Sequence, residues 1–369
     1  MAAIPGTDVL LLGPGPSPVS TRVRKALSAP PRSHLDPELL ELLDDIRGML
    51  RTVFQAPESN LTLAVSGTGT TAMDAAAVNL VEPGMNALVV VNGYFGERLA
   101  QVLTRHGAFV DRLQAEWGRP VDPAAIERAL IDARFDVVAM VHAETSTGVV
   151  NPVAAVAPII RKREVLFIVD AVTSLGAIPV DVATWDADVV YSCGQKGLGA
   201  PPGLSPMTVS SRARLSPPTC HSYALSFKLL EDYWIGRQYH HTISSSAVYA
   251  LHAALSEVVS EGLETRFARH RAAHDALVSG LASIGLELFP DPAHRLVSLN
   301  AIRIPPGVDE KAVRARLLTK HRIEIGAGLG PLAGRIWRVG LMGTGATIDN
   351  AQRVVAALAE ALGRKRPKS

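Results

Sequence analysis

A lysine and an aspartate each follow a short apolar segment near the middle of the chain. Asp170 comes directly after Val165–Val169, and Lys196 lies a few residues after Val189–Tyr191, in the segment SCGQKG. Both apolar runs are rich in β-branched residues, which is typical of buried parallel strands. Ligands of open α/β sheets bind at the carboxyl ends of the strands, so we expect both charged groups at such a site.

The surroundings of Lys196 indicate a reactive amine, whereas most lysines of a protein are simply solvated. Glycines at 194, 197, 199 and 203 allow the backbone to approach a ligand closely. A desolvated lysine loses its proton readily and can form a Schiff base with an aldehyde. Pyridoxal phosphate needs such a lysine and an acid that holds the proton of its ring nitrogen. Asp170 is the candidate acid, and a helix cap is its alternative role.

A second glycine-rich turn, SGTGTT, lies between a predicted strand, Leu61–Val65, and an alanine-rich predicted helix, Ala72–Leu80. Free backbone N–H groups at a helix N-terminus, with hydroxyls beside them, bind phosphate. No lysine follows in the spacing of a P-loop, which disfavours a nucleoside triphosphate. The turn therefore predicts a phosphate cradle, with an ordinary turn between strand and helix as the alternative.

Two more predicted strands, Ala87–Val91 and Val137–Val141, end in the polar segments NGYFG and HAETSTG. The alternation of strands and helices predicts a doubly wound α/β domain with a mainly parallel sheet. The pair His240-His241 is typical of metal sites, but no third ligand lies at helical spacing, so we expect no metal.

Beyond a helical pattern over 244–284, interrupted at Gly262, short strands and helices alternate to the end of the chain. A length of 369 residues favours two domains. We expect an N-terminal arm at 1–20, a large domain at 21–262 and a small α+β domain at 263–369. The predicted elements of the small domain are strands Leu286–Phe289, Leu296–Ile304, Ile323–Ile325 and Ile336–Leu341, and helices Glu310–His321 and Ile348–Leu362.

The composition, with 47% apolar and 20% charged residues, is that of a soluble globular enzyme. A net charge of +2 implies no nucleic-acid partner, and the basic segment at 364–368 is expected to be solvated. Two cysteines without metal or disulfide spacing favour a reducing, cytoplasmic location. No apolar run approaches the roughly 18 residues of a membrane span, and the N-terminus lacks a signal-peptide pattern.

Nine blocks of sequence together resemble the class V, fold-type I aminotransferases, which depend on pyridoxal 5′-phosphate. The blocks are GPGPSPVS, HLDPE, SGTGTTAMDAA, NGYFGER, HAETSTGV, VDAVTSLG, SCGQKGLGAPPG, YHHT and WRVGLMG. They span essentially the whole chain and resemble the alanine–glyoxylate and serine–pyruvate (serine–glyoxylate) group in particular. The resemblance implies transfer of an amino group from alanine or serine to glyoxylate or pyruvate. It also implies a homodimer with shared active sites and an N-terminal arm that crosses the interface.

The resemblance implies a role for each matching residue. Lys196 holds the cofactor and moves the substrate's α-proton, and Asp170 pairs with the ring nitrogen. The other implied cofactor contacts are Phe95 at the ring face, Thr145 near the phenolic oxygen, Gly69, Thr70 and Gln195 at the phosphate, and Tyr239 and Thr242 at the phosphate of the other subunit. The implied substrate-binding residues are Arg338, which would bind the carboxylate, together with His34 and Gly15. Some relatives have tryptophan at the position of Phe95, and the pattern around Arg338 also suits an outward-facing surface arginine.

Three other functions stay open. The blocks EWGRPVDP, GLETRFARH and GPLAGRIWRVG also resemble the (S)-ureidoglycine–glyoxylate aminotransferases. That branch has glutamine and asparagine where this chain has His34 and Tyr239, so we expect ureidoglycine to be a poor donor. Lyases such as desulfurases share the fold, but neither cysteine lies in a mobile-loop motif. A non-enzymatic relative is disfavoured because Asp170, Lys196 and Arg338 are all present.

Overall fold

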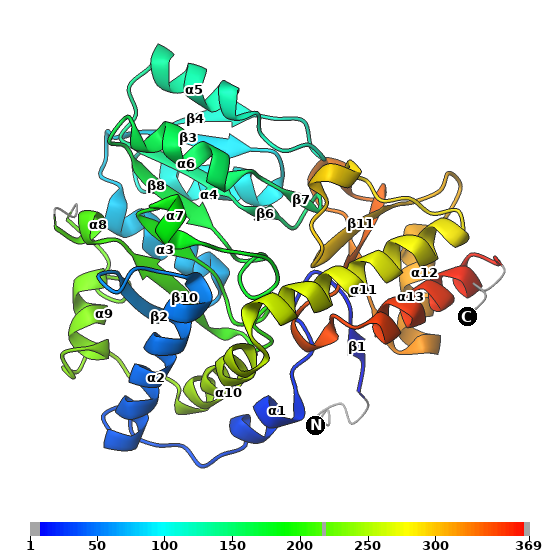
Figure 1. Ribbon diagram of the computed structural model, residues 1–369, viewed down its shortest axis with the longest axis horizontal. Helices are drawn as coiled ribbons and strands as arrows, with labels where there is room; N and C mark the ends of the chain where they lie inside the picture. The colour runs from blue at the N-terminus through cyan, green and yellow to red at the C-terminus, as the bar shows by residue number, and fades with distance from the viewer. Residues whose placement is uncertain (1–7, 216–218, 365–369) are drawn as a thin grey trace.

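The computed structural model describes residues 8–215 and 219–364, so nearly all of the expected basic tail lies outside the described residues (Figure 1). The large domain is built on a seven-stranded sheet in which all strands run parallel except β10. In spatial order the strands are β2 (Leu61–Gly67), β10 (Gly203–Val209), β9 (Val189–Tyr191), β8 (Leu166–Asp170), β5 (Val137–Val141), β3 (Asn86–Val91) and β4 (Phe109–Gln114). The predicted doubly wound, mainly parallel sheet is confirmed.

The strand register brings the predicted site to one edge of this sheet. Val141 pairs with Asp170, and Asp170 pairs with Tyr191, so β5, β8 and β9 end at the same level. The loops that follow these strands therefore leave the sheet side by side. One of them carries Lys196, five residues after Tyr191.

Helices cover the large sheet and extend from it (Figure 1). The helices α3 (Gly69–Leu80) and α4 (Tyr94–Arg105) pack against strands, whereas α5 (Pro123–Asp132), α6 (Val153–Arg161) and α7 (Val182–Trp185) pack in sequence beside one another. The remaining helices of this domain are α1 (Thr21–Leu27), α2 (Pro37–Phe54), α8 (Ser211–Leu215), α9 (Phe227–Trp234) and α10 (Ser245–Glu261). In α2 the side chains Leu39, Leu43, Ile46, Leu50 and Val53 are all buried, as their helical spacing predicts.

The C-terminal part forms a smaller α+β unit around α11 (Leu263–Ser283). Its antiparallel sheet has the order β11 (Leu299–Arg303), β14 (Ile336–Gly340) and β13 (Gly326–Ala327), covered by α12 (Glu310–His321) and α13 (Ile348–Ala361). The start of the chain joins it, because β1 (Leu10–Leu11) pairs in parallel with β12 (Ile323–Glu324). A short hairpin of β6 (Ala143–Glu144) and β7 (Val149–Val150) follows β5.

One predicted strand was wrong, and two strands of the large sheet were not predicted. Leu286–Phe289 is not a strand, because only Leu288 bridges to Ile302. The strand β4 escaped prediction because its sequence, FVDRLQ, is polar and lies at an edge of the sheet. The strand β10 was not predicted because proline, here Pro206, is rare inside strands. The pairing with β9 begins only at Met207, so the missing N–H of proline removes no hydrogen bond between these two strands.

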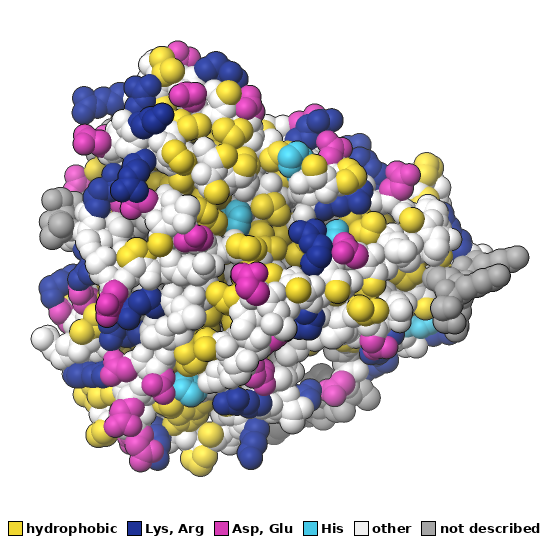
Figure 2. All heavy atoms as spheres, viewed as in Figure 1, with side chains coloured by type: hydrophobic (Ala, Val, Ile, Leu, Met, Phe, Trp, Pro, Cys, Tyr) yellow, Lys and Arg dark blue, Asp and Glu magenta, His cyan; other side chains and the backbone are white. Residues whose placement is uncertain are grey.

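Buried apolar side chains form two large clusters. One joins residues between Val23 and Val258, and the other joins Leu12 to residues between Ala273 and Ala359. Basic and acidic side chains are interspersed over the face shown in Figure 2, in keeping with the small net charge. Within 8–215 and 219–364, no helix is long and apolar enough to cross a membrane.

Candidate active site

A cavity of about 210 Å³ opens at the carboxyl edge of the large sheet. It brings together seven of the predicted site residues, which come from the N-termini of α3 and α4, the end of β8, the turn between β6 and β7 and the loop after β9. They are Gly69, Thr70, Phe95, Thr145, Asp170, Gln195 and Lys196. The other lining residues are Thr68, Met73, Arg98, Val141, Ala143, Val172 and Cys193.

Asp170, the last residue of β8, lies buried in the cavity wall with both oxygens engaged. Its Oδ1 accepts the backbone N–H of Val172 at 2.8 Å, and its Oδ2 accepts the Tyr191 hydroxyl at 3.0 Å. Burial raises the pKa of Asp170 to about 7, against the effect of these two hydrogen bonds. A buried carboxylate of this kind favours a cationic partner such as a protonated ring nitrogen.

Lys196 reaches into the cavity from the loop after β9, and its Nζ donates to the carbonyl of Pro14. Burial lowers the pKa of Lys196; Arg338 lowers it further, whereas Cys193 and Asp170 raise it. Gly15 lies directly against this side chain, because a Cβ there would come within 2.5 Å of Nζ. Its φ of +114° also favours glycine, so the arm is shaped around the lysine.

The predicted phosphate cradle is formed by the start of α3. The first N–H groups of a helix lack helical partners and favour an anion. Arg98 adds a cation: its Nη1 donates to the Thr70 hydroxyl at 3.2 Å, and its guanidinium lies 4.9 Å from the centre of the Phe95 ring. The buried Oε1 of Gln195 has no hydrogen-bond partner within the described residues. The cavity therefore offers the amide of Gln195, the anion cradle at the start of α3, the amine of Lys196 and the acid Asp170. This set of groups fits pyridoxal phosphate.

Glu144 is a site residue that the sequence reasoning missed. Its carboxylate is fully buried and accepts the backbone N–H groups of Phe95 and Gly96, both at 3.1 Å, and the Ser146 hydroxyl at 2.6 Å. Burial raises its pKa, and these hydrogen bonds oppose the rise. Glu144 thereby fixes the start of α4 and, with it, the position of Phe95. The segment HAETSTG stood out as polar, but a contact with α4 has no signal in the sequence.

Arg338 extends from β14 of the small domain toward the same cavity. Its Nε donates to the Ala327 carbonyl at 2.7 Å, and its Nη1 approaches the Thr145 carbonyl at 3.5 Å. The residue is only 6% exposed, which excludes an outward-facing surface arginine. Burial lowers its pKa to about 10, while Glu144 and Glu324 raise it. A buried guanidinium with free N–H groups suits a substrate carboxylate.

His34, Tyr239 and Thr242 lie outside this cavity. The rings of His34 and Tyr239 are 5.0 Å apart, and Tyr239 is 62% exposed. Between Tyr239 and Thr242, His241 accepts or donates a hydrogen bond of 2.8 Å with Ser66, at the end of β2. Within the described residues, no group of three or more His, Cys, Asp or Glu side chains could hold a metal ion.

Comparison with known proteins gives one consistent family. The family model "Aminotransferase class-V" matches residues 24–335. The (S)-ureidoglycine–glyoxylate transaminase of Bacillus subtilis is 36% identical, over 96% of this chain and 90% of that protein. The alanine–glyoxylate aminotransferase of Drosophila melanogaster is 35% identical, over 95% of this chain and 92% of that protein.

A solved structure agrees with these sequence matches. The alanine–glyoxylate aminotransferase from Nostoc superposes with a TM-score of 0.95 at 43% identity, covering 98% of this chain and 97% of that one. Both the fold and the sequence are therefore shared over almost the full length. The chain belongs to the class V aminotransferases, pyridoxal phosphate-dependent transaminases of fold type I.

Proposed function

We propose that the protein transfers the amino group of a small amino acid, alanine or serine, to a small 2-oxo acid, with glyoxylate preferred over pyruvate. The observation that carries this proposal is the shared cavity, where Lys196 and Asp170 meet and which Arg338 approaches from the small domain. The printed names of the relatives from Drosophila and Nostoc support glyoxylate as the acceptor.

Bound pyridoxal phosphate supplies an electron-poor ring that stabilises negative charge at the substrate's α-carbon. The residues of the chain then have separate tasks. Asp170 would hold the proton of the ring nitrogen, Phe95 would cover one face of the ring, and Thr145 would lie near the phenolic oxygen. Lys196 takes the α-proton, which its lowered pKa favours because more of the amine is neutral near pH 7.

The phosphate and the substrate are held from opposite directions. Gly69, Thr70 and Gln195 bind the phosphate at the start of α3, and Arg98 contributes charge through its contact with Thr70. Arg338 would pair with the substrate carboxylate, while the lack of a side chain at Gly15 lets the arm pack directly against Lys196. The cofactor would keep the amino group when the first oxo acid leaves, and the same residues would serve its transfer to the second oxo acid.

The experiment is a half-reaction screen. Each amino acid is mixed with the cofactor-loaded protein, and loss of the visible absorption band is followed without any acceptor. Alanine and serine should discharge the band fastest, and glyoxylate should restore it faster than pyruvate. Discharge only by acidic or aromatic amino acids would contradict the proposal.

The working unit in this proposal is a homodimer in which Tyr239 and Thr242 reach the phosphate of the partner's site. Their exposure outside the cavity of their own chain supports it. We further propose a large domain at 21–262, a small domain at 263–369 and an arm at 1–20, consistent with the two core clusters. A reducing, cytoplasmic location is supported by the free cysteines Cys193 and Cys220.

Subunit mixing tests the shared site. Lys196→Ala subunits are mixed with subunits that carry Tyr239→Ala and Thr242→Ala. If the segment acts on the partner's cofactor, each hybrid dimer regains one complete site, and activity appears on mixing. No regain, with hybrids confirmed by mass, would show that the segment serves its own chain.

A second candidate function is (S)-ureidoglycine–glyoxylate transamination, which the relative from Bacillus subtilis favours. His34 and Tyr239, which differ from that branch, lie together as a ring pair. A ureido group buried without partners for its amide atoms costs about 1–3 kcal/mol for each group. We therefore expect alanine and serine to exceed ureidoglycine in kcat/KM. Ureidoglycine winning by about tenfold, or about 1.4 kcal/mol, would promote the second candidate.

A further inference from the structure

The backbone around Lys196 is held at three consecutive carbonyl groups. Ser17 of the arm donates its N–H to the Gln195 carbonyl at 2.9 Å and its hydroxyl to the Lys196 carbonyl at 2.8 Å. The Gly197 carbonyl accepts Nη2 of Arg266 at 2.6 Å. The lysine is thus fixed from two sides by residues that contact neither its amine nor the cavity.

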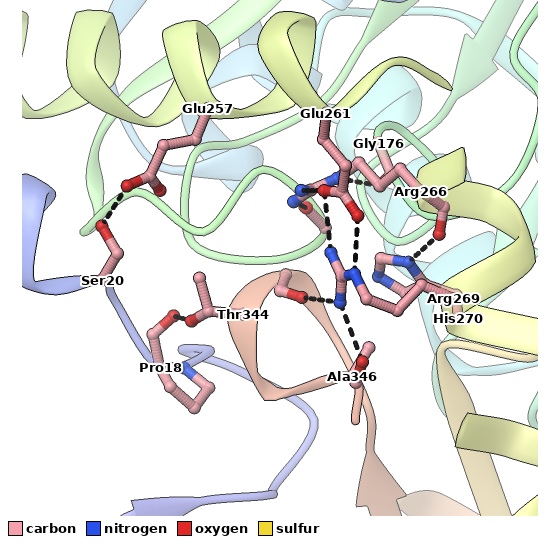
Figure 3. Close-up of polar contacts among 12 residues, drawn as sticks. Pro18, Ser20, Gly176, Glu257, Glu261, Arg266, Arg269, His270, Thr344 and Ala346 are labelled. Carbon is pink, nitrogen blue, oxygen red and sulfur yellow. Dashed lines mark hydrogen bonds and ion pairs between the residues drawn. The ribbon is translucent and has the colours of Figure 1, made fainter. Parts of the chain in front are cut away.

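Arg266 lies in the first turn of α11 and is only 3% exposed. Its guanidinium uses all three nitrogens: Nε donates to the Gly176 carbonyl at 2.8 Å, Nη2 donates to Gly197, and Nη1 pairs with Glu261 at 2.6 Å. Figure 3 shows Arg266 with Gly176 and Glu261, and Arg269 beside the same glutamate. Gly176 follows Asp170 along one loop, and Gly197 follows Lys196 along the next. One side chain therefore ties together the two loops that carry the acid and the amine.

The two tied loops are already packed without spare room. A Cβ on Gly197 would come within 2.3 Å of the Leu175 carbonyl oxygen. Where two backbones approach closely, their carbonyl groups need hydrogen-bond donors. The planar guanidinium of Arg266 provides two, one to Gly176 and one to Gly197. Glu261 neutralises the buried cation and also pairs with Arg269, whose Nη1 donates to the Gly343 and Ala346 carbonyls at 2.9 and 2.8 Å.

We propose that Arg266, together with Ser17, is a positioning residue for Lys196: it holds the lysine loop against the Asp170 loop so that the amine meets the substrate's α-carbon. The inference rests on the proposed transaminase reaction. None of the atoms of Arg266 reaches the cavity, so its effect on catalysis passes through the backbone of Gly197. Loosening this loop should also hydrate the amine, whose neighbours are Cys193, Asp170 and Arg338.

The test replaces Arg266 by lysine, which keeps the charge but loses the fork. The control is Arg212→Lys, because Arg212 also pairs with a carboxylate, that of the buried Asp188, and also donates to a backbone carbonyl, that of Val165 at 3.2 Å, although its side chain is 44% exposed. Arg212 lies at the amino end of β8, away from the cavity. Ser17→Ala is the second test variant, in case Arg266→Lys does not fold.

Two measurements are made on each variant. The first is the pH midpoint of Lys196 labelling by an amine reagent in the apoenzyme, followed by mass spectrometry of the labelled peptide. The second is exchange of the α-proton of alanine in D2O by the loaded enzyme, with kcat and KM separated. Arg266→Lys should move the midpoint upward, toward the ordinary lysine value, by half a pH unit or more and lower kcat for exchange about tenfold or more. KM should change less than about threefold, and Ser17→Ala should change in the same directions by less.

The contrast between variants decides the proposal. The proposal is overturned if Arg266→Lys and Arg212→Lys behave equally in both measurements. If Arg266→Lys does not fold, wild-type values for Ser17→Ala overturn the proposal. If the wild-type protein exchanges no α-proton with any amino acid, the transaminase proposal fails, yet the labelling midpoint still decides whether Arg266 positions the lysine.

Discussion

Two regions of the molecule carry predicted cofactor contacts, and they differ in completeness. The cavity at the edge of the large sheet gathers Lys196, Asp170 and their neighbours within one chain, with both oxygens of Asp170 already hydrogen-bonded. Tyr239 and Thr242 are exposed and, with His34 beside Tyr239, lie outside that cavity. The first region gathers its predicted contacts within one chain, whereas the second would contribute to a cofactor site through the proposed homodimer.

The largest expected effect concerns the complete region. Lys196→Ala removes both the covalent link to the cofactor and the group that moves the α-proton, so turnover should fall by on the order of a thousandfold or more. Thermal unfolding of the apoenzyme should change little, because within the described residues the amine makes one hydrogen bond, to the Pro14 carbonyl. Transamination assays with alanine and glyoxylate measure the loss, and activity within tenfold of wild type would show that another lysine serves.

The second prediction uses the pKa of Asp170, which burial raises from 3.8 to about 7. Unfolding returns the carboxyl to its ordinary pKa and releases a proton, so this group's contribution to apoenzyme stability is complete below about pH 4. It is lost as the pH rises to about 7, at up to about 1.4 kcal/mol per unit. Asp170→Asn lacks this dependence. In urea unfolding between pH 5 and 8, the stability of the mutant apoprotein relative to the wild type should increase as the pH rises. A difference that stays constant with pH would contradict the raised pKa of Asp170.

A third, smaller effect is expected at the boundary between the domains. Arg338→Lys keeps a charge but loses the fork that matches a carboxylate, and a charge-assisted hydrogen bond contributes about 1.5–3 kcal/mol. We expect kcat/KM for alanine to fall about a hundredfold, with cofactor affinity nearly unchanged. Steady-state kinetics and cofactor titration measure the two quantities. Weaker cofactor binding, with unchanged kcat/KM at saturating cofactor, would make Arg338 a structural residue.

The smallest effect tests the exposed region. Exchanging His34 for Gln and Tyr239 for Asn gives the chain the amides expected in the ureidoglycine branch. The ratio of kcat/KM for ureidoglycine over alanine should rise about tenfold, or about 1.4 kcal/mol. Phe95→Trp is the control, because it changes the cofactor stack but not the amide pattern. A ratio that stays constant would show that donor choice resides elsewhere.

The strand pattern predicted Lys196 and Asp170 because each lies shortly after a short apolar strand. Val137–Val141 and Val189–Tyr191 were predicted with the observed bounds, and register then fixes where Asp170 and Lys196 lie. Periodicity also found α2 and Glu310–His321, whose ends carry capping residues. The family resemblance, and not the strand pattern, identified Phe95, Thr145 and Arg338.

Contacts between distant segments could not be predicted. Glu144 holds the start of α4 from 48 residues away, and Arg266 holds the Gly197 carbonyl from 69 residues away. Such pairs depend on how loops pack after the sheet has formed, and no local period records them. The strand β10 was hidden for a different reason, since Pro206 breaks the usual strand composition.

The most direct test of the account is borohydride reduction of the cofactor-loaded protein, followed by peptide mass spectrometry. Reduction fixes the cofactor to the amine that carries it. The account predicts one adduct, on Lys196, and its absence from the Lys196→Ala variant. An adduct on any other lysine, or none in a protein that is yellow and active, would contradict the central claim that this lysine holds the cofactor.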